Sequence, residues 1–322
     1  ARDLVNRPAN YATPTDLAEV ALDIAGGFEN MRCQVLSEED AAELGMGSFL
    51  GVAQGSDEPA AFIVMEHNPG REDLDTVVLA GKGITFDTGG ISLKPAEKMD
   101  RMRGDMGGGA AVLGTMLAVG KLDLPLHVVG LVPATENMPG ARAYKPGDVV
   151  TAMSGKTIEV INTDAEGRLI LADALAYADR FAPKAVVDLA TLTGACVVAL
   201  GQGMAAGVFS TDEDLLARLQ KASEASGERI WPLPLYDEYL ESLESLTADV
   251  SNTGGRFGGV GTSAMFLKQF AEGYPWVHLD IAGMSFEERP AKPGKRAHLQ
   301  KGGTGFGVRL LVQFLRDWVA TT

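Results

Sequence analysis

The chain has 322 residues, and its 46% hydrophobic content and mean hydropathy of +0.05 are typical of a soluble globular protein with a substantial core. Its formal net charge of −15 argues against nonspecific binding to nucleic acid or to an anionic membrane. The longest apolar stretch, around residues 110–119, is about half as long as a membrane span requires. Two cysteines make no disulfide framework and no signal peptide opens the chain, so a cytoplasmic location is expected.

The first predicted helix begins after Thr13, because Thr13 suits an N-cap and Pro14 suits the first helical turn. It should extend to about Ile24. The acidic string at 37–40 predicts the start of a short second helix, since carboxylates favour helix N-termini.

Apolar, β-branched runs at 61–66 and 76–80 predict strands that are buried on both faces. Further strands are predicted at 31–36, 126–132, 157–161, 186–189 and 277–281, and further helices at 107–119, 168–181, 211–226 and 305–319. Strands that alternate with helices imply a largely parallel sheet covered on both faces. The predicted fold class is therefore α/β, a three-layer α/β/α sandwich around a mixed, largely parallel sheet.

Ionisable residues are unusually dense between residues 82 and 168, in two Gly-containing strings at 81–90 and 162–168 and in the segment between them. They are the carboxylates Asp87, Asp105, Asp164 and Glu166 and the lysines Lys82 and Lys94. Such a set is too costly to bury among apolar residues without partners. More than one divalent metal ion is the most economical partner, so the pattern indicates a two-metal hydrolase.

The spacing of these residues predicts how they meet. Asp87 should follow the strand at 76–80 through a short turn, at the sheet edge where ligands bind in such folds. Asp164 and Glu166 lie two apart after the strand at 157–161, and in extended backbone that spacing points both carboxylates to one side. Hard oxygen ligands suit Mg²⁺, Mn²⁺ or Zn²⁺.

An alternative interpretation is that these acids cap helices and pair with the neighbouring lysines, and any one of them fits that role about equally well. A lysine nitrogen can bind a metal only when it is deprotonated, which requires burial and the field of the cation. Arg168 stands at the start of a predicted helix, where anions are favoured, but it could equally pair with Asp164 or Glu166.

Six strings of the chain, at 82–90, 99–108, 136–139, 145–148, 162–171 and 278–283, resemble those of the leucyl (cytosol) aminopeptidase family. The similarity runs from about Asn6 to the C-terminal helix. It implies that residues 1–322 form a single metallopeptidase catalytic domain, without the smaller N-terminal domain of full-length members. It also implies a homohexamer of two stacked trimers, which acts on peptides with a free N-terminus.

The resemblance also implies how the metal ligands divide. Asp87 and Glu166 would bridge two divalent ions, Zn²⁺ or Mn²⁺, and Asp164 would complete the first ion. Lys82 and Asp105 would complete the second. A water or hydroxide between the metals would be the nucleophile.

Two catalytic residues and a side-chain pocket follow from the same resemblance. Lys94 would hydrogen-bond the scissile carbonyl oxygen, and Arg168 would hold a bicarbonate ion that relays the proton of the water to the leaving amine. The pocket for the N-terminal side chain would be lined by Met102, Thr191, Gly194 and Ala282. Such a pocket suits Leu or another apolar residue. Some relatives carry Met three positions after the equivalent of Ala282, where this chain has Ser285.

Two alternatives to a leucyl aminopeptidase stay open from the sequence. One is a dipeptidase of the Cys-Gly type or another two-metal hydrolase, which would use the same ligands. The other is a bifunctional DNA-binding accessory role, as in some bacterial relatives, which the strong negative charge disfavours.

Overall fold

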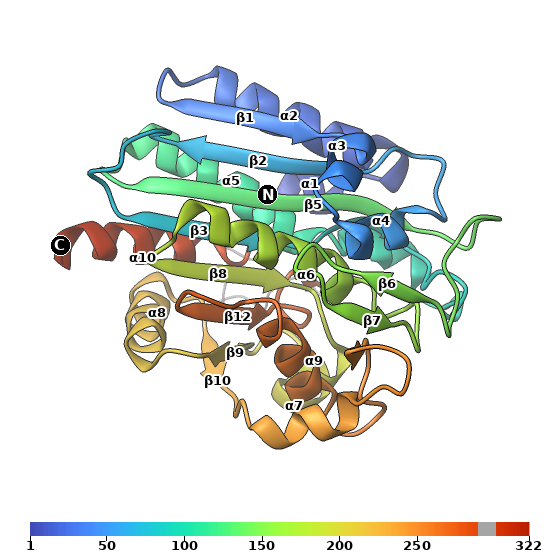
Figure 1. The fold of residues 1–322 in the computed structure, drawn as a ribbon. Coiled ribbons are helices and arrows are strands. Elements are labelled where there is room, and N and C mark those ends of the chain that lie inside the picture. The colour runs from blue at the N-terminus through green and yellow to red at the C-terminus, as the bar shows by residue number, and fades with distance from the viewer. Residues whose placement is uncertain (289–300, 322) are drawn as a thin grey trace.

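The protein is described here by a computed structural model, which describes residues 1–288 and 301–321. A central sheet of nine strands runs through the molecule (Figure 1). Its strands are β1 (Met31–Leu36), β2 (Ala61–His67), β3 (Thr76–Gly81), β4 (Gly83–Asp87), β5 (His127–Asn137), β8 (Ala185–Ala190), β9 (Ala206–Ser210), β10 (Ile230–Pro232) and β12 (Trp276–Asp280).

The strand order is β1-β2-β5-β3-β8-β12-β9-β10, and β4 continues beside β5. Five of the eight pairings are parallel, namely β3 with β5 and β8, β8 with β12, β9 with β10 and β4 with β5. The other three are antiparallel. The sheet is therefore mixed and mostly parallel, as predicted.

Helices cover both faces of this sheet (Figure 1). One face packs against α1 (Arg2–Asn6), α2 (Pro14–Gly26), α5 (Gly107–Leu122), α8 (Glu213–Ser226) and α10 (Val308–Thr321), and the other against α4 (Gly47–Ala53), α6 (Gly167–Ala178) and α9 (Gly259–Lys268). Alternate residues of β3 serve the two cores, since Val77 and Leu79 belong to the first and Val78 and Ala80 to the second. The predicted three-layer sandwich is confirmed.

Short elements complete the described chain. Two small sheets hold β6 (Val149–Thr151), β7 (Thr157–Glu159) and β11 (Val250–Ser251), and β13 (Phe286–Glu287) with β14 (Gly302–Gly303). The remaining helices are α3 (Glu38–Glu43) and α7 (Gly194–Leu200) and the 3₁₀ turns η1 (Ala9–Tyr11), η2 (Met99–Gly104), η3 (Asp179–Phe181) and η4 (Asp237–Leu243). None of the helices in the described ranges has the length and apolarity that crossing a bilayer demands.

The capping predictions hold at the first two predicted helices. Thr13 accepts a hydrogen bond from the backbone N–H of Asp16, and the Asp16 side chain accepts one back from the backbone N–H of Thr13. Ser37 and Asp40 form the same reciprocal capping box at α3. Each pair satisfies two N–H groups that a helix start would otherwise leave without a partner.

Two predictions near the site are wrong. The segment before Asp87 is not a turn but the strand β4, which is separated from β3 by Lys82 alone. The strand predicted at 157–161 is the shorter β7, and it belongs to the small sheet rather than the central one. The acids that follow it therefore reach the site from a separate substructure.

The glycines at the start of α5 allow an unusually close contact between that helix and the sheet. A Cβ on Gly108 would lie 2.0 Å from the carbonyl oxygen of Leu189. The backbone of Lys82 is held in the same contact, because its N–H donates to Leu189 O at 3.0 Å and its carbonyl accepts from Gly109 N at 2.8 Å. This packing fixes the backbone from which the Lys82 side chain projects.

Candidate active site

One cavity of about 570 Å³ lies where strands of the central sheet end. Asp87 is the last residue of β4, and the segments that follow β8 and β12 form other parts of the wall. All eleven residues that the sequence singled out line it: Lys82, Asp87, Lys94, Met102, Asp105, Asp164, Glu166, Arg168, Thr191, Gly194 and Ala282. Residues more than 190 positions apart in the chain are thus brought to one place.

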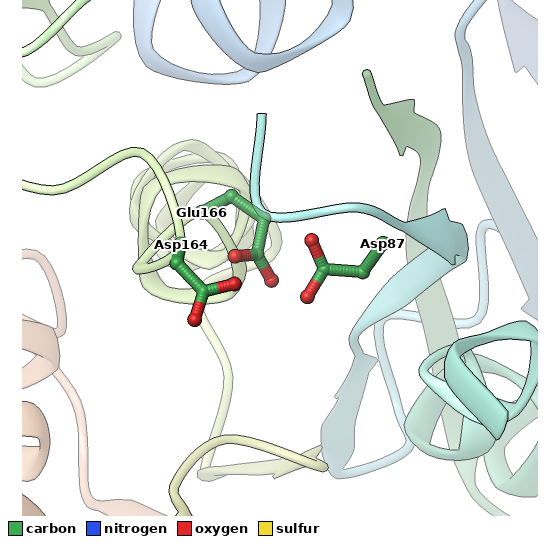
Figure 2. Close-up of side chains that lie close together, drawn as sticks. All are labelled: Asp87, Asp164 and Glu166. Atoms are coloured by element: carbon green, nitrogen blue, oxygen red, sulfur yellow. The ribbon is translucent and has the colours of Figure 1, made fainter. Parts of the chain in front are cut away.

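Three carboxylates converge in this cavity. Asp87, Asp164 and Glu166 each offer an oxygen, and these atoms all lie within 4.8 Å of one another (Figure 2). The predicted reason for their proximity is wrong, because Glu166 is not extended but has helical backbone angles (φ −76°, ψ −34°) immediately before α6. A turn and a helix start, rather than a strand, aim Asp164 and Glu166 together.

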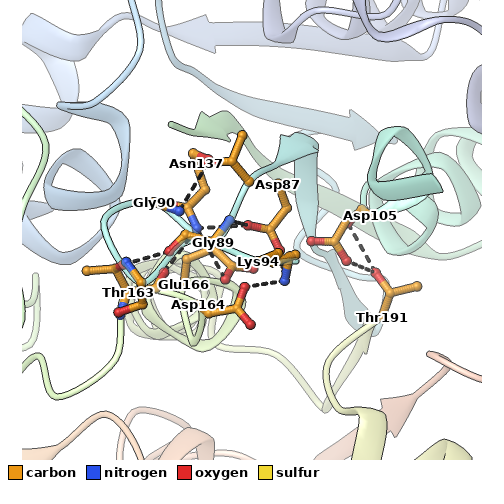
Figure 3. Close-up of polar contacts among 12 residues, drawn as sticks. Asp87, Gly89, Gly90, Lys94, Asp105, Asn137, Thr163, Asp164, Glu166 and Thr191 are labelled. Atoms are coloured by element: carbon orange, nitrogen blue, oxygen red, sulfur yellow. Dashed lines mark hydrogen bonds and ion pairs between the residues drawn. The ribbon is translucent and has the colours of Figure 1, made fainter. Parts of the chain in front are cut away.

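Two lysines lie between the acids. Lys82 Nζ is 2.6 Å from Asp105 Oδ2 and 2.7 Å from Glu166 Oε1. Lys94 Nζ is 2.7 Å from Asp87 Oδ2 and also contacts Asp164 (Figure 3). The alternative that the lysines pair with the acids is therefore part of this arrangement, but two ammonium groups do not balance four carboxylates.

Electrostatics in the cavity show the same imbalance. Burial lowers the pKa of Lys82, but the carboxylates of Asp105, Glu166 and Asp87 outweigh it, so the net shift is upward. Burial raises the pKa of Glu166, and the neighbouring charge of Asp87 raises it further. Ionised acids are thus destabilised here, and additional positive charge would relieve them. The donor set of clustered carboxylate oxygens fits divalent cations.

A buried amide without a predicted role orients two of these acids. Asn137, the last residue of β5, donates to Asp87 Oδ1 at 2.8 Å and to Thr163 O at 3.0 Å, and its Nδ2 lies 3.5 Å from Glu166 Oε2 (Figure 3). Gly90 makes room for it, since a Cβ there would lie 2.8 Å from Asn137 Oδ1. Asn137 falls in the string at 136–139 that resembles the family, and this was the feature of the sequence that could have indicated a role for it.

Arg168 is the second residue of α6 and is only 7% exposed. Its Nη1 donates to Asn252 O at 2.8 Å, whereas its Nε finds no hydrogen-bond partner among the described residues. Burial lowers its pKa to about 10, so the guanidinium stays charged at neutral pH. In the described ranges no ion pair joins it to Asp164 or Glu166, and its buried Nε is left as a donor without a partner there.

The four residues predicted for the side-chain pocket come from different elements. Met102 lies in η2, Thr191 follows β8, Gly194 opens α7 and Ala282 follows β12. Thr191 Oγ1 donates to Asp105 Oδ1 at 2.7 Å, which ties this wall to the acidic cluster.

Ser285 also lines the cavity, whereas its neighbour Met284 packs into the core with 7% exposure. The small Ser285 side chain is itself buried, and its hydroxyl packs against Gly107, where a Cβ would lie 2.0 Å from it.

Comparison with known proteins agrees with this geometry. The sequence profile of the "Cytosol aminopeptidase family, catalytic domain" matches residues 1–312. The chain belongs to the cytosol aminopeptidase family.

Curated members of the cytosol aminopeptidase family resemble the chain over nearly all of it. A "Probable cytosol aminopeptidase" of Variovorax paradoxus (strain S110) is 56% identical over 317 residues, which cover 98% of this chain and 60% of that protein. A protein of the same name from Geotalea uraniireducens (strain Rf4) is 54% identical over 318 residues, 98% of this chain and 62% of that protein. The chain thus spans about three fifths of the length of these relatives.

A second residue without a predicted role shapes the cavity wall of this family member. Asp280, at the end of β12, accepts hydrogen bonds from Thr193 Oγ1 at 2.6 Å and from Ala282 N at 3.1 Å. Thr193 in turn caps α7 through the backbone N–H of Cys196. Asp280 therefore joins the segments after β8 and β12, and it lies in the family-like string at 278–283.

Proposed function

We propose that the protein is a metal-dependent aminopeptidase, which hydrolyses the N-terminal residue from peptides. The convergence of Asp87, Asp164 and Glu166 within 4.8 Å, in a cavity that also holds Lys82 and Lys94, is the observation that carries this proposal. Membership of the cytosol aminopeptidase family and the names of the relatives support it.

The residues present fit two divalent ions, Zn²⁺ or Mn²⁺. Asp87 and Glu166 would bridge both ions, with Asp164 on the first and Lys82 and Asp105 on the second. Bound there, the ions would supply the positive charge that makes a bridging water nucleophilic near neutral pH. Lys82 is held between Asp105 and Glu166, and its ammonium would have to lose its proton to serve as a ligand.

Lys94 and Arg168 are proposed as the catalytic side chains. The Lys94 side chain is 20% exposed, so its ammonium can donate to the scissile carbonyl oxygen as negative charge develops there. Arg168, with its available Nε, would hold a bicarbonate ion, whose chemistry is proton transfer from the water to the leaving amine. The unmodified α-amine of the substrate would lie near Asp105, which limits cleavage to the first residue.

Substrate preference follows from the wall formed by Met102, Thr191, Gly194 and Ala282. None of these four side chains is charged, which supports a preference for Leu or other apolar first residues, though such a pocket separates similar side chains by only about 1–3 kcal/mol. Ser285 adds depth and a hydroxyl at this wall.

Metal removal and reconstitution test the proposed function. After dialysis against a chelator, release of 4-nitroaniline from Leu-4-nitroanilide should stop, and added Mn²⁺ or Zn²⁺ should restore it. Parallel assays with a Cys-Gly dipeptide and a phosphate ester separate the aminopeptidase from a dipeptidase and from another two-metal hydrolase. Leu-anilide turnover that survives metal stripping would rule the proposal out.

Three further properties are proposed from the same membership. Residues 1–322 form one catalytic domain, and the protein assembles as a homohexamer of two trimers. It works in the cytosol, a location that the names of its relatives give for them. Sedimentation of the metal-loaded protein tests the assembly.

A further inference from the structure

A glycine-rich loop at 253–259 carries Arg256 to the mouth of the cavity. Gly255 and Gly258 have left-handed backbone angles (φ +84° and +65°), which side chains rarely adopt. Thr253, Gly255 and Arg256 all line the cavity. The loop thus presents one long cationic side chain, with the exposed Phe257 next to it and glycines on either side of the two.

This loop is tied firmly to the segment that holds two of the clustered acids. Asn252, which precedes it, accepts the backbone N–H of Ile161 at 2.8 Å and donates from its side chain to Asn162 O at 2.7 Å. Its carbonyl also accepts Arg168 Nη1 at 2.8 Å. The start of the loop is therefore anchored to the segment that carries Asp164 and Glu166.

Arg256 differs from the other cavity cations in its partners. Lys82 and Lys94 each contact two carboxylates, and Arg101 pairs with Glu288. Arg256 has no ion pair or hydrogen bond within the described ranges. No carboxylate of the described chain thus pairs with this guanidinium, although five carboxylates line the same cavity.

The surroundings of Arg256 also favour an anion. The helix α9 begins at Gly259 with Gly258 as its N-cap and no side-chain cap, and Gly259 and Thr262 line the cavity. Its first N–H groups therefore carry the positive end of the helix dipole. Arg168, whose buried Nε has no hydrogen-bond partner among the described residues, also lines the cavity.

We propose that Arg256 binds the C-terminal carboxylate of a dipeptide or tripeptide whose first residue lies at the acidic cluster. The inference rests on the proposed aminopeptidase function and narrows its substrate class to short peptides with a free carboxylate. A short zwitterionic peptide would be oriented by both ends, its amine toward the acids and its carboxylate toward Arg256. A cavity of about 570 Å³ is of the size that holds small ligands.

The test compares peptides that differ only at the carboxylate. The kcat/KM values for Leu-Gly and Leu-Gly-Gly are measured against those for Leu-Gly-amide and Leu-Gly-Gly-amide, with metal-loaded protein. We expect the wild type to favour the free acid by about 10-fold for at least one length, the scale of a charge-assisted hydrogen bond. Arg256→Ala should reduce this ratio to within about twofold, mainly through KM, and Arg256→Lys should keep part of it.

Arg142→Ala is the matched control, because Arg142 is an exposed arginine that does not line the cavity; it should leave the ratio unchanged. Equal turnover of acids and amides by the wild type, or a preference that persists in Arg256→Ala, overturns this inference while leaving the aminopeptidase intact. Failure to hydrolyse any of the four peptides overturns the proposed function and this inference with it.

Discussion

This fold holds two groups of ionisable side chains, most of them buried, and the two are built in opposite ways. The first, called here the cavity cluster, comprises Asp87, Asp105, Asp164 and Glu166 with Lys82 and Lys94. The second, called the buried pair, is Asp188 on β8 with His278 on β12, which are direct neighbours across the two strands. In the buried pair, Asp188 accepts His278 Nδ1 at 2.6 Å and Trp276 Nε1 at 2.7 Å, one donor for each oxygen.

The pKa shifts of the two groups reflect this difference in construction. In the cavity cluster, burial and then the charge of Asp87 raise the pKa of Glu166, so its ionised form is destabilised by the fold. In the buried pair, burial lowers the pKa of His278, but Asp188 outweighs it and the net shift is upward. The buried pair is thus complete as it stands, whereas the cavity cluster has an excess of negative charge. Burial of an acid alone does not indicate a functional site, whereas a group of buried charges without enough compensating partners does.

The largest effect is expected from Glu166→Gln. Loss of a proposed bridging carboxylate should lower kcat/KM by on the order of 10⁴-fold, the scale seen when one member of a catalytic unit is removed. The metal-free variant should nevertheless unfold at the same or a higher denaturant concentration, because a destabilised charge has been removed. Steady-state kinetics and urea unfolding measure the two quantities.

Glu228→Gln is the matched control for that variant. Glu228 is also buried, at 4% exposure, and burial also raises its pKa, but it accepts the backbone N–H groups of Gly307 and Leu310 at the start of α10 and pairs with Arg309. It should lose stability and keep turnover per folded molecule. A marked loss of metal-free stability in Glu166→Gln would mean that the cavity cluster is a structural network like the buried pair.

His278→Leu, in contrast to Glu166→Gln, should lower the stability of the fold. It leaves Asp188 charged and buried with Trp276 as its remaining donor, and breaking a buried pair in this way costs about 3–5 kcal/mol of unfolding free energy. Adding Asp188→Asn should recover much of that loss, since the uncompensated charge disappears while an acceptor for Trp276 remains. Urea unfolding of the single and double variants tests this. A single variant as stable as the wild type would contradict the role given to the buried pair.

Much of the fold could be predicted because its signals are local. Thr13 with Asp16 marks a capping box, and the predicted strand at 31–36 has the same first and last residues as β1. The strand β4 could not be recognised, because it is short and follows β3 after a single residue, and the glycines on both sides of Lys82 resembled a turn.

The gathering of the site residues in one cavity could be predicted, but not the way in which the chain achieves it. The spacing of Asp164 and Glu166 suggested an extended strand, whereas a turn held by Asn252, some 90 positions away, orients them. No local pattern encodes such a contact. The same holds for Asn137, whose position depends on the pairing of β5 with β4. The catalytic and metal roles of the residues remain predictions.

The smallest expected effect is the pH dependence of the buried pair. Because the pKa of His278 is raised in the folded state, its stabilisation is fully present below the unfolded value of about 6.5. It is lost as pH rises through the folded pKa, by at most about 1.4 kcal/mol per pH unit. The difference in unfolding free energy between wild type and His278→Gln should therefore be largest near pH 6 and shrink toward pH 9, measured by urea unfolding of metal-free protein. Subtracting the variant cancels the other titrating groups, including those of the cavity cluster. A difference that grows with pH would show that Asp188 does not hold the imidazolium, and the contrast between the two groups of acids would then fail.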